Sequence, residues 1–359
     1  MMLHFIIKSK LYNVDFVRDR TEGFDNFIKE IERQDVDHLA SVAGVDKQMV
    51  KEAAIAYATA KNSMEFHGLG VTEQEQGSKT VMLIADLAMI TGNIGRKGVG
   101  VNPLRGQNNV QGAADMGCQP HQGAGYFEVA DKKNQKFYTE KYGVTHPTKP
   151  GLKIPQMFEA AIEKELKGLW IIGEDIVQTD PNSAHVVEAM NSLELLVVQE
   201  IFMSETAKLA TVVLPGTTFL EKDGTFTNTE RRIQRVNRAV PPLPGTKPDG
   251  VIVTDMMQKL GFDQPTYDAD KMLKEIADVV PFFKGVTRER LGKLGLQWPV
   301  QEDGTDTQIL HTETFKLGKG RLKNFDWKES TEIETNKNCL LYTSPRPRDL
   351  STSRMPSSA

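Results

Sequence analysis

Residues 92–117, GNIGRKGVGVNPLRGQNNVQGAADMG, gather the side chains with the clearest chemical use in this chain. Seven glycines and six carboxamides fall in the stretch, and Arg105 lies near its middle. Because glycine loses the most backbone entropy on ordering and adds no packing, the stretch should be a loop. Bare N–H groups admit a ligand closely, and Arg105 can bind an anion through two N–H groups. The carboxamides suit a heteroaromatic ring that carries phosphates, and they are Asn93, Asn102, Gln107, Asn108, Asn109 and Gln111. A long structural loop of turn residues is the alternative.

Length and composition bound the class of protein. At 359 residues the chain can form two or three domains, and 39% hydrophobic with 26% charged residues is typical of a soluble globular protein. The net charge of -4 gives no general attraction to nucleic acid or to an anionic membrane, so neither is expected as a partner. The longest apolar stretches are too short to span a bilayer, and the opening residues lack a signal-peptide cleavage pattern.

The chain has two cysteines, Cys118 and Cys339, which make no disulfide framework and fit a reducing, cytoplasmic location. Cys118 and His121 have a spacing that a metal ion could use. A closed zinc site needs four ligands, and no second pair lies nearby, so we assign no metal ligand. Cys339 opens a tail rich in Ser, Arg and Pro, residues 339–359, which we expect to be disordered and non-native.

The elements before the glycine-rich loop are expected to form half of a βαβ unit. Helices are expected at residues 24–31 and 46–60, with Asp46 as an N-cap. Residues 63–71 read as a strand entering a Gly68-Leu69-Gly70 turn, and Ser78 could cap a helix over residues 79–90. Such a turn could hold a phosphate at the helix N-terminus, although an ordinary strand-to-helix connection is the alternative.

Residues 168–215 give the clearest pattern in the chain. Strands are expected at 168–176, 193–201 and 211–215, separated by a helix that starts at Asp180 with Pro181 in its first position and by a short helix at 204–210. This order predicts a parallel sheet, and ligands of such sheets bind beyond the carboxyl ends of the strands. Acidic and amide groups at those ends could pair with the N–H edge of a guanine or with ribose hydroxyls. Simple capping and turn roles are the alternative.

The remaining segments offer weaker signals. Residues 127–150 are polar and are expected to be a surface excursion. Residues 221–240 predict a β-hairpin whose arginines form a solvated or salt-bridged ribbon rather than a nucleic-acid patch. Asp249 and Asp268 are expected to cap helices, a further helix is expected at 287–294, and residues 295–338 should be loop-like.

Several strings together resemble one family, the molybdenum or tungsten bis(pyranopterin guanine dinucleotide) oxidoreductases, and within it the catalytic (alpha) subunit of formate dehydrogenase. The resemblance runs from near the start to about residue 327, and RGQNNVQG is too long and unusual a string for chance. It implies α/β, doubly wound parallel-sheet domains of the formate dehydrogenase/DMSO reductase-like type. The strings are RTEGFDNF (20–27), GLGVTEQEQG (68–77), TGNIGRKGVGVNPLRGQNNVQGAADMG (91–117), GEDIVQTDPN (173–182), VVQEIFMSETAKLATVVLPGTTFLEKDGTFTNTERRIQRVNRAV (197–240) and KPDG (247–250).

The resemblance also implies site residues. In formate dehydrogenases the arginine that matches Arg105 lies beside the metal and orients or charge-stabilises formate, a role that suits a guanidinium. The related nitrate reductases resemble the chain around TGNIGR but carry a different string where RGQNN stands. At the position of Glu73 the family often has glutamine. The implied cofactor-binding positions are Gly68, Leu69, Gly70, Glu73, Gln107, Asn108, Gly173, Asp175, Thr179, Gln199, Gly216 and Asp249.

The family also has parts that these residues lack. Its members begin with an iron–sulfur domain of CxxC type, continue with a Cys or selenocysteine that ligates the metal beside a catalytic His, and end in a β-barrel domain. The chain is therefore expected to be an internal fragment. We predict a partial dinucleotide-binding domain at residues 1–107, a second one at 108–220, a connecting α+β region at 221–338, and the tail at 339–359.

The function implied by the resemblance is oxidation of formate to CO2. The implied cofactor is bis-molybdopterin guanine dinucleotide with Mo or W, and a 4Fe-4S cluster would lie in the missing N-terminal part. The implied partners are electron-transfer subunits, which are iron–sulfur proteins linked to NAD, ferredoxin or a hydrogenase. Two alternatives stay open, namely another enzyme of this cofactor class such as a nitrate reductase, and a non-catalytic scaffold subunit of a respiratory complex. The fragment alone is expected to be inactive.

Overall fold

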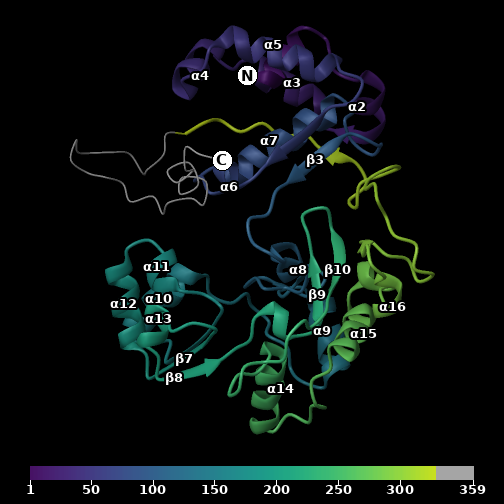
Figure 1. Ribbon diagram of the computed structural model, residues 1–359. Coiled ribbons are helices and arrows are strands. Elements are labelled where there is room, and N and C mark those ends of the chain that lie inside the picture. Colours follow the sequence, from purple (N-terminus) through teal and green to yellow (C-terminus); the bar gives the residue numbers. More distant parts are fainter. Residues whose placement is uncertain (329–359) are drawn as a thin grey trace, which may run out of the picture.

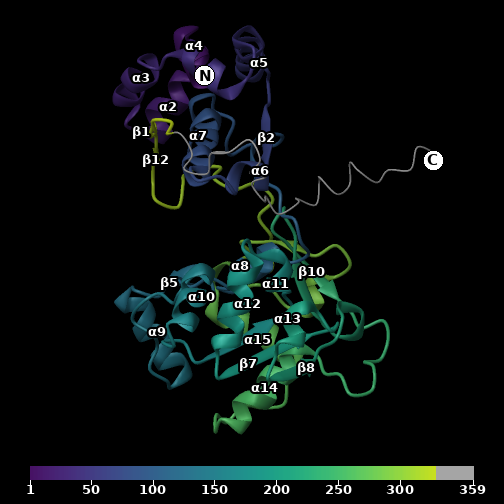
Figure 2. The ribbon, with the colours of Figure 1, turned by 90° about the vertical axis from the view of Figure 1, so that its left-hand side faces the viewer.

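The computed structural model describes residues 1–328 and shows a mixed α/β protein that contains parallel sheets (Figure 1). In Figures 1 and 2 the elements near the N-terminus and the last described segment form a group that lies apart from the elements between them. The expected α/β class with parallel sheets is confirmed. The domain boundaries at residues 107, 220 and 338 stay a prediction, and the predicted tail lies outside the described residues.

Short helices open the chain. They pack around one core in which Ile6, Phe27 and Ala54 are almost fully buried. The helices expected at 24–31 and 46–60 are confirmed, and Asp46 accepts a 2.8 Å hydrogen bond from the Met49 N–H. Three further helices have only seven or eight residues each, too few for a periodic pattern to stand out. The helices are α1 (Met2–Lys8), α2 (Val14–Arg20), α3 (Phe24–Glu32), α4 (Val36–Ala43) and α5 (Lys47–Thr59).

A strand–helix–strand unit follows, formed by β2 (Met64–His67), α7 (Gly77–Ile90) and β3 (Gly100–Pro103). The two strands pair in parallel. The expected glycine turn after β2 is wrong, because these residues form a one-turn helix, α6 (Leu69–Thr72). Ser78 does not cap α7, because this helix already begins one residue earlier and has no side-chain cap.

The central sheet has the order β6-β7-β8, with every neighbour parallel. Its hydrophobic strands pack against the helices through buried Val186, Leu196 and Val198. The expected parallel sheet of three strands is confirmed. Pro181 does not start a helix, because Asn182 is the N-cap of α12 and a separate turn of helix precedes it. The elements are α10 (Ile154–Ile162), β6 (Gly168–Ile172), α11 (Ile176–Thr179), α12 (Ser183–Ser192), β7 (Leu195–Glu200), α13 (Glu205–Lys208) and β8 (Val212–Pro215).

The glycine-rich stretch 92–117 is not the continuous loop that was expected, because β3 and α8 lie within it. Helix α8 (Val110–Asp115) is followed by the small β4–β5 pair (Gln122–Gly123 and Phe127–Glu128). The interpretation of residues 127–150 as a surface excursion is wrong in part, because α9 (Lys132–Tyr142) lies there. Its Tyr138 is buried and donates a 2.6 Å hydrogen bond to the Ala124 carbonyl.

The expected hairpin is confirmed as β9 (Gly224–Thr227) and β10 (Arg232–Val236), which pair antiparallel. A third strand, β11 (Leu296–Gln297), joins β10. Asp268 caps α15 as expected, but Asp249 is the first residue of α14 and its side chain bonds elsewhere. The remaining elements are η1 (Phe219–Glu221), α14 (Asp249–Lys259), α15 (Ala269–Val279), η2 (Pro281–Phe283) and α16 (Arg288–Leu291), the last being shorter than expected.

The last described segment, yellow in Figure 1, returns to the N-terminal helices. Strand β12 (Gly320–Arg321) pairs in parallel with β1 (Thr21–Glu22), and Leu322 enters the N-terminal core. This segment is mostly irregular, as expected, yet it is anchored by burial. Within residues 1–328 no helix combines the length and the apolar character needed to cross a bilayer.

Candidate functional site

The carboxyl ends of β6, β7 and β8 form one edge of the central sheet. The Gly173 N–H donates to the Gln199 carbonyl at 2.9 Å, and the Gly216 N–H donates to the Glu200 carbonyl at 3.0 Å. Three of the predicted binding residues, Gly173, Gln199 and Gly216, are therefore neighbours. The strand pairing itself produces this arrangement, since parallel strands end at a common edge.

A polar cluster lies beside this edge. Gln199 is 1% exposed, and its Nε2 donates to Asp249 Oδ1 at 2.7 Å. Lys222 forms an ion pair with the other carboxylate oxygen of Asp249. Asp249 thus acts as the partner of two side chains from other segments. Lys222 was not among the predicted residues, because its contact with Asp249 spans 27 positions of sequence.

Two buried oxygens of this cluster have no hydrogen-bond partner, namely Gln199 Oε1 and Thr217 Oγ1. A buried polar group without a partner costs about 1–3 kcal/mol, so both atoms fit a ligand that brings N–H or O–H donors. Gly216 presents bare backbone here, and a Cβ at its position would lie 3.3 Å from Asp249 Oδ1. The cluster therefore fits the donor edge of a purine base or the hydroxyls of a sugar.

Asp175 and Thr179, after β6, already have partners within the protein. The Asp175 carboxylate accepts hydrogen bonds from the Thr206 backbone N–H at 3.0 Å, the Thr206 hydroxyl at 2.6 Å and the Gln178 amide at 2.6 Å. Burial acts to raise the pKa of Asp175, but these hydrogen bonds together hold it below its ordinary value. Thr179 donates to Glu174 at 2.7 Å. These contacts match the capping alternative, and a ligand role for either residue stays a prediction.

The segment after β2 lies beside the residues that precede Arg105. The Leu104 N–H donates to the His67 carbonyl at 2.7 Å, and a Cβ on Gly68 would lie 3.7 Å from the Leu104 carbonyl oxygen. Gly70 and Glu73 are exposed on or next to α6, as is Leu69. Helix α6 lies between β2 and α7, and a phosphate at the N-terminus of the helix that follows the strand stays a prediction.

Arg105 lies in the exposed loop between β3 and α8, together with exposed Gln107 and Asn108. Its backbone N–H donates to Thr229 Oγ1 at 2.9 Å, and the Thr227 N–H donates to Asn109 Oδ1 at 2.9 Å. The tip of the β9–β10 hairpin thus holds this loop at two points. Among the described residues, no hydrogen bond or ion pair joins Arg105 to the Gln199 cluster, so their sharing of one ligand stays a prediction.

A buried carboxylate supports Arg105 from behind. Arg105 Nη2 donates to Gln111 Oε1 at 3.2 Å, and Gln111 Nε2 donates to Asp115 Oδ1 at 2.9 Å. Asp115 also accepts from the Tyr126 hydroxyl at 2.7 Å and from the Trp298 indole at 2.9 Å. Burial raises the pKa of Asp115, while these donors and the Arg105 charge oppose the rise. Sequence reasoning did not find Asp115, Tyr126 or Trp298, because no local pattern links residues so far apart.

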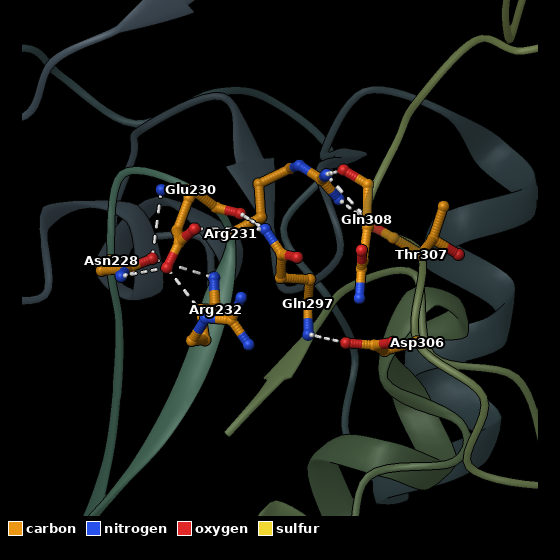
Figure 3. Close-up of polar contacts among 8 residues, drawn as sticks. All are labelled: Asn228, Glu230, Arg231, Arg232, Gln297, Asp306, Thr307 and Gln308. Carbon is orange, nitrogen blue, oxygen red and sulfur yellow. Dashed lines mark hydrogen bonds and ion pairs between the residues drawn. The ribbon is translucent and has the colours of Figure 1, made fainter. Parts of the chain in front are cut away.

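The arginines of the hairpin have two different environments. Arg232 pairs with Glu230 at 2.8 Å, as expected for a salt-bridged ribbon. Arg231 is instead aimed at the adjoining segment and donates to the carbonyls of Thr307 and Gln308, each at 3.2 Å (Figure 3). It also donates to the Trp298 carbonyl. Arg231 is therefore a structural clamp rather than a surface charge.

No metal centre is formed by protein side chains within residues 1–328. The structure has no group of three or more His, Cys, Asp or Glu residues arranged to hold an ion in this part of the chain. Cys118 is an exposed free thiol.

Comparisons with known proteins place the chain in context. Residues 8–259 match the family model described as molybdopterin oxidoreductase. The chain is 40% identical over 350 residues to the F420-dependent formate dehydrogenase subunit alpha of Methanocaldococcus jannaschii. The aligned region covers 96% of this chain and 52% of that relative. The chain is 38% identical over 333 residues to formate dehydrogenase H of Escherichia coli, which covers 91% of the chain and 47% of that relative. It thus spans about half the length of these relatives.

A solved structure gives the same picture at the level of the fold. Acetylene hydratase from Pelobacter acetylenicus aligns with a TM-score of 0.61 and 17% identity, over 90% of this chain and 49% of that one. At this identity the likeness shows a shared fold alone.

Proposed function

Because the chain belongs to the molybdopterin oxidoreductase family, we propose that it is an internal part of a molybdenum- or tungsten-dependent formate dehydrogenase, which oxidises formate to CO2. The observation that carries the proposal is Arg105, an exposed guanidinium in a glycine-rich loop, held by the hairpin and by Gln111. A guanidinium presented in this way binds a small carboxylate through two N–H groups. Arg105 would orient formate and offset its charge.

The residues at the sheet edge fit the cofactor that the family implies. Gln199, Thr217, Gly216 and Asp249 would hold the guanine or ribose of a pterin guanine dinucleotide, since two of them bury unpartnered oxygens. When bound, the cofactor supplies a metal centre that takes up an electron pair. Binding of two dinucleotides, a 4Fe-4S cluster in the rest of the protein, electron-transfer partner subunits and a cytoplasmic location are further parts of this proposal.

The test uses the full-length enzyme, loaded with cofactor. Arg105→Gln removes the guanidinium, and we expect formate kcat/KM to fall by about 100-fold or more while molybdenum content is unchanged. Arg105→Lys keeps the charge without the planar fork and should recover only part of the activity. Arg235 is an exposed arginine on β10, so Arg235→Gln is the matched control and should leave kcat/KM unchanged.

Two outcomes would overturn the proposal. One is an enzyme with full metal content that reduces nitrate and leaves formate unchanged, which favours another member of the family. The other is a full-length protein that binds no molybdenum or tungsten, which favours a scaffold subunit. The isolated chain should show no formate-dependent dye reduction, because it spans only about half of its relatives.

A further inference from the structure

We propose that Gln111, Asp115, Tyr126 and Trp298 form a positioning network that fixes the direction of the Arg105 guanidinium. The inference rests on the proposed function, since it concerns how Arg105 is presented to a carboxylate substrate. None of the four residues needs to touch the substrate. They act through the hydrogen bond between Arg105 and Gln111.

The orientation of the Gln111 amide is determined by what lies behind it. An ionised carboxylate only accepts hydrogen bonds, so the NH2 group of Gln111 must face Asp115, 2.9 Å away. Gln111 Oε1 then points in the other direction and accepts from Arg105. A reversed amide would present NH2 to the guanidinium and lose both contacts. Asp115 thus selects the amide orientation that holds Arg105.

Neutral donors keep Asp115 in place. The Trp298 indole, which can only donate, binds one carboxylate oxygen, and the Tyr126 hydroxyl binds the other. The Asp115 backbone carbonyl also accepts from the Gly125 N–H at 2.8 Å. Asp115 is 0% exposed, so its carboxylate is surrounded by protein and is held by the donors of Gln111, Tyr126 and Trp298.

Trp298 is itself anchored by Arg231, the clamp residue drawn in Figure 3. The Arg231 guanidinium lies 5.3 Å from the centre of the Trp298 ring and donates to the Trp298 carbonyl. The Trp298 N–H donates in return to the Arg231 carbonyl at 3.1 Å. The network therefore ends in the same hairpin whose tip holds the Arg105 backbone.

Fold stability alone does not explain this arrangement. Among the described residues Asp115 has no direct ion-pair partner, although it is fully buried. A buried charge without a counter-ion is costly, and apolar side chains of similar size often stabilise a core as well or better. Two cations balance the Asp115 charge without pairing with it, namely Arg105, one amide away, and Arg231. Arg231 is partly buried and donates to backbone carbonyls, whereas Arg105 lies in the exposed loop, so Arg105 is the cation of the two that can face a ligand.

The first test is a double-mutant cycle in the full-length, cofactor-loaded enzyme. Gln111→Leu should lower formate kcat/KM by about tenfold or more, the equivalent of one charge-assisted hydrogen bond, with molybdenum content unchanged. In an Arg105→Gln background the same change should cost less than about twofold, because its effect passes through Arg105. If Gln111→Leu lowers formate kcat/KM by the same factor in both backgrounds, the two residues act independently and the network is overturned. Tyr126→Phe removes only one hydroxyl and repeats the cycle with little risk to folding, and Gln122→Leu on β4 is the matched control.

The second test needs no catalysis. In the isotopically labelled chain the side-chain NH2 signal of Gln111, identified by its loss in Gln111→Leu, should exchange slowly with solvent. Asp115→Asn lets the amide reverse, so this exchange should become about tenfold faster. The indole signal of Trp170, in the separate central sheet, is the folding control. Equal exchange in both proteins would overturn the network, whereas absence of formate turnover with slow, Asp115-dependent exchange would overturn only the proposed function.

Discussion

At the scale of single residues, the two acidic side chains of the site are stabilised in different ways. Asp249 is paired with the Lys222 ammonium and with Gln199, so its charge is balanced locally. Asp115 is surrounded by neutral donors, and the charges that balance it lie on Arg105 and Arg231, neither of which pairs with it directly. The first arrangement suits a binding pocket, and the second suits the support of a cation that must face a ligand.

Gln199 provides a prediction for the polar cluster beside the edge of the central sheet. Gln199→Leu keeps the volume but removes the buried acceptor and the donor to Asp249, so a ligand loses a hydrogen bond worth about 1–3 kcal/mol. We expect the full-length enzyme to retain about tenfold less dinucleotide, measured as guanine nucleotide released on denaturation. Gln48→Leu, on the exposed face of α5, should leave the content unchanged. Unchanged nucleotide content in Gln199→Leu would remove this residue from the site.

The sequence could indicate only part of the site. Gln199, Gly216 and Arg105 could be predicted, because each is marked locally, by a strand end or by an unusual glycine-rich string. Asp115 and Trp298 could not be found in this way. They are 183 positions apart, and their contact exists only because the chain around Trp298 packs against α8.

At the scale of elements, α7 contributes buried side chains to the N-terminal core and also contacts the returning segment. Its Asp86 is 2% exposed and accepts a 3.4 Å hydrogen bond from the Lys323 N–H of the returning segment. Burial raises the pKa of Asp86 from its ordinary 3.8 to about 7. The helix therefore contains a carboxyl group that is easier to bury protonated than ionised.

Asp86 makes the stability of this part depend on pH. Between about pH 4 and pH 7 the folded chain holds a proton that the unfolded chain has released, so this group's stabilisation is lost as the pH rises. Asp86→Asn removes the charge and keeps an oxygen for Lys323. The gain in stability of Asp86→Asn over the parent chain, measured as the difference between their free energies of unfolding, should be about 2–3 kcal/mol larger at pH 8 than at pH 5. Denaturant titrations at the two pH values check this, and a constant difference would contradict it.

The elements differ in how well the sequence predicted them. The β6–β8 sheet could be predicted because its buried strands are continuous apolar runs separated by helices. Helix α6 was missed because a glycine-rich string also fits a turn, and the close local packing of its last residue against the start of α7 has no sequence pattern of its own. Gly77 packs so closely that a Cβ would lie 2.3 Å from the Thr72 carbonyl oxygen.

At the scale of the whole molecule, the beginning and the end of the described chain are tied together. The β1–β12 pair and buried Leu322 join segments that are about 300 positions apart. No local sequence signal predicts such a contact. The N-terminal helices thus share their core with a segment that follows the central sheet and the hairpin in the sequence.

Leu322 tests the contribution of the returning segment to this core. It is 6% exposed in the N-terminal core, so Leu322→Ala should destabilise that core by about 2–5 kcal/mol. Hydrogen exchange should rise in α1, α3 and α5 while the β6–β8 sheet keeps its protection. Leu317→Ala, in the same segment but 81% exposed, is the matched control. Equal exchange in both variants would show that the returning segment adds nothing.

The β1–β12 tie also has a consequence for biosynthesis. A ribosome makes α1, α3 and α5 before the central sheet, but these helices lack Leu322 until nearly all of residues 1–328 have been made. The central sheet draws its core from neighbouring residues and can fold long before then. Within residues 1–328 the order of folding should therefore reverse the order of synthesis, with α1, α3 and α5 fully packed only after the central sheet has formed.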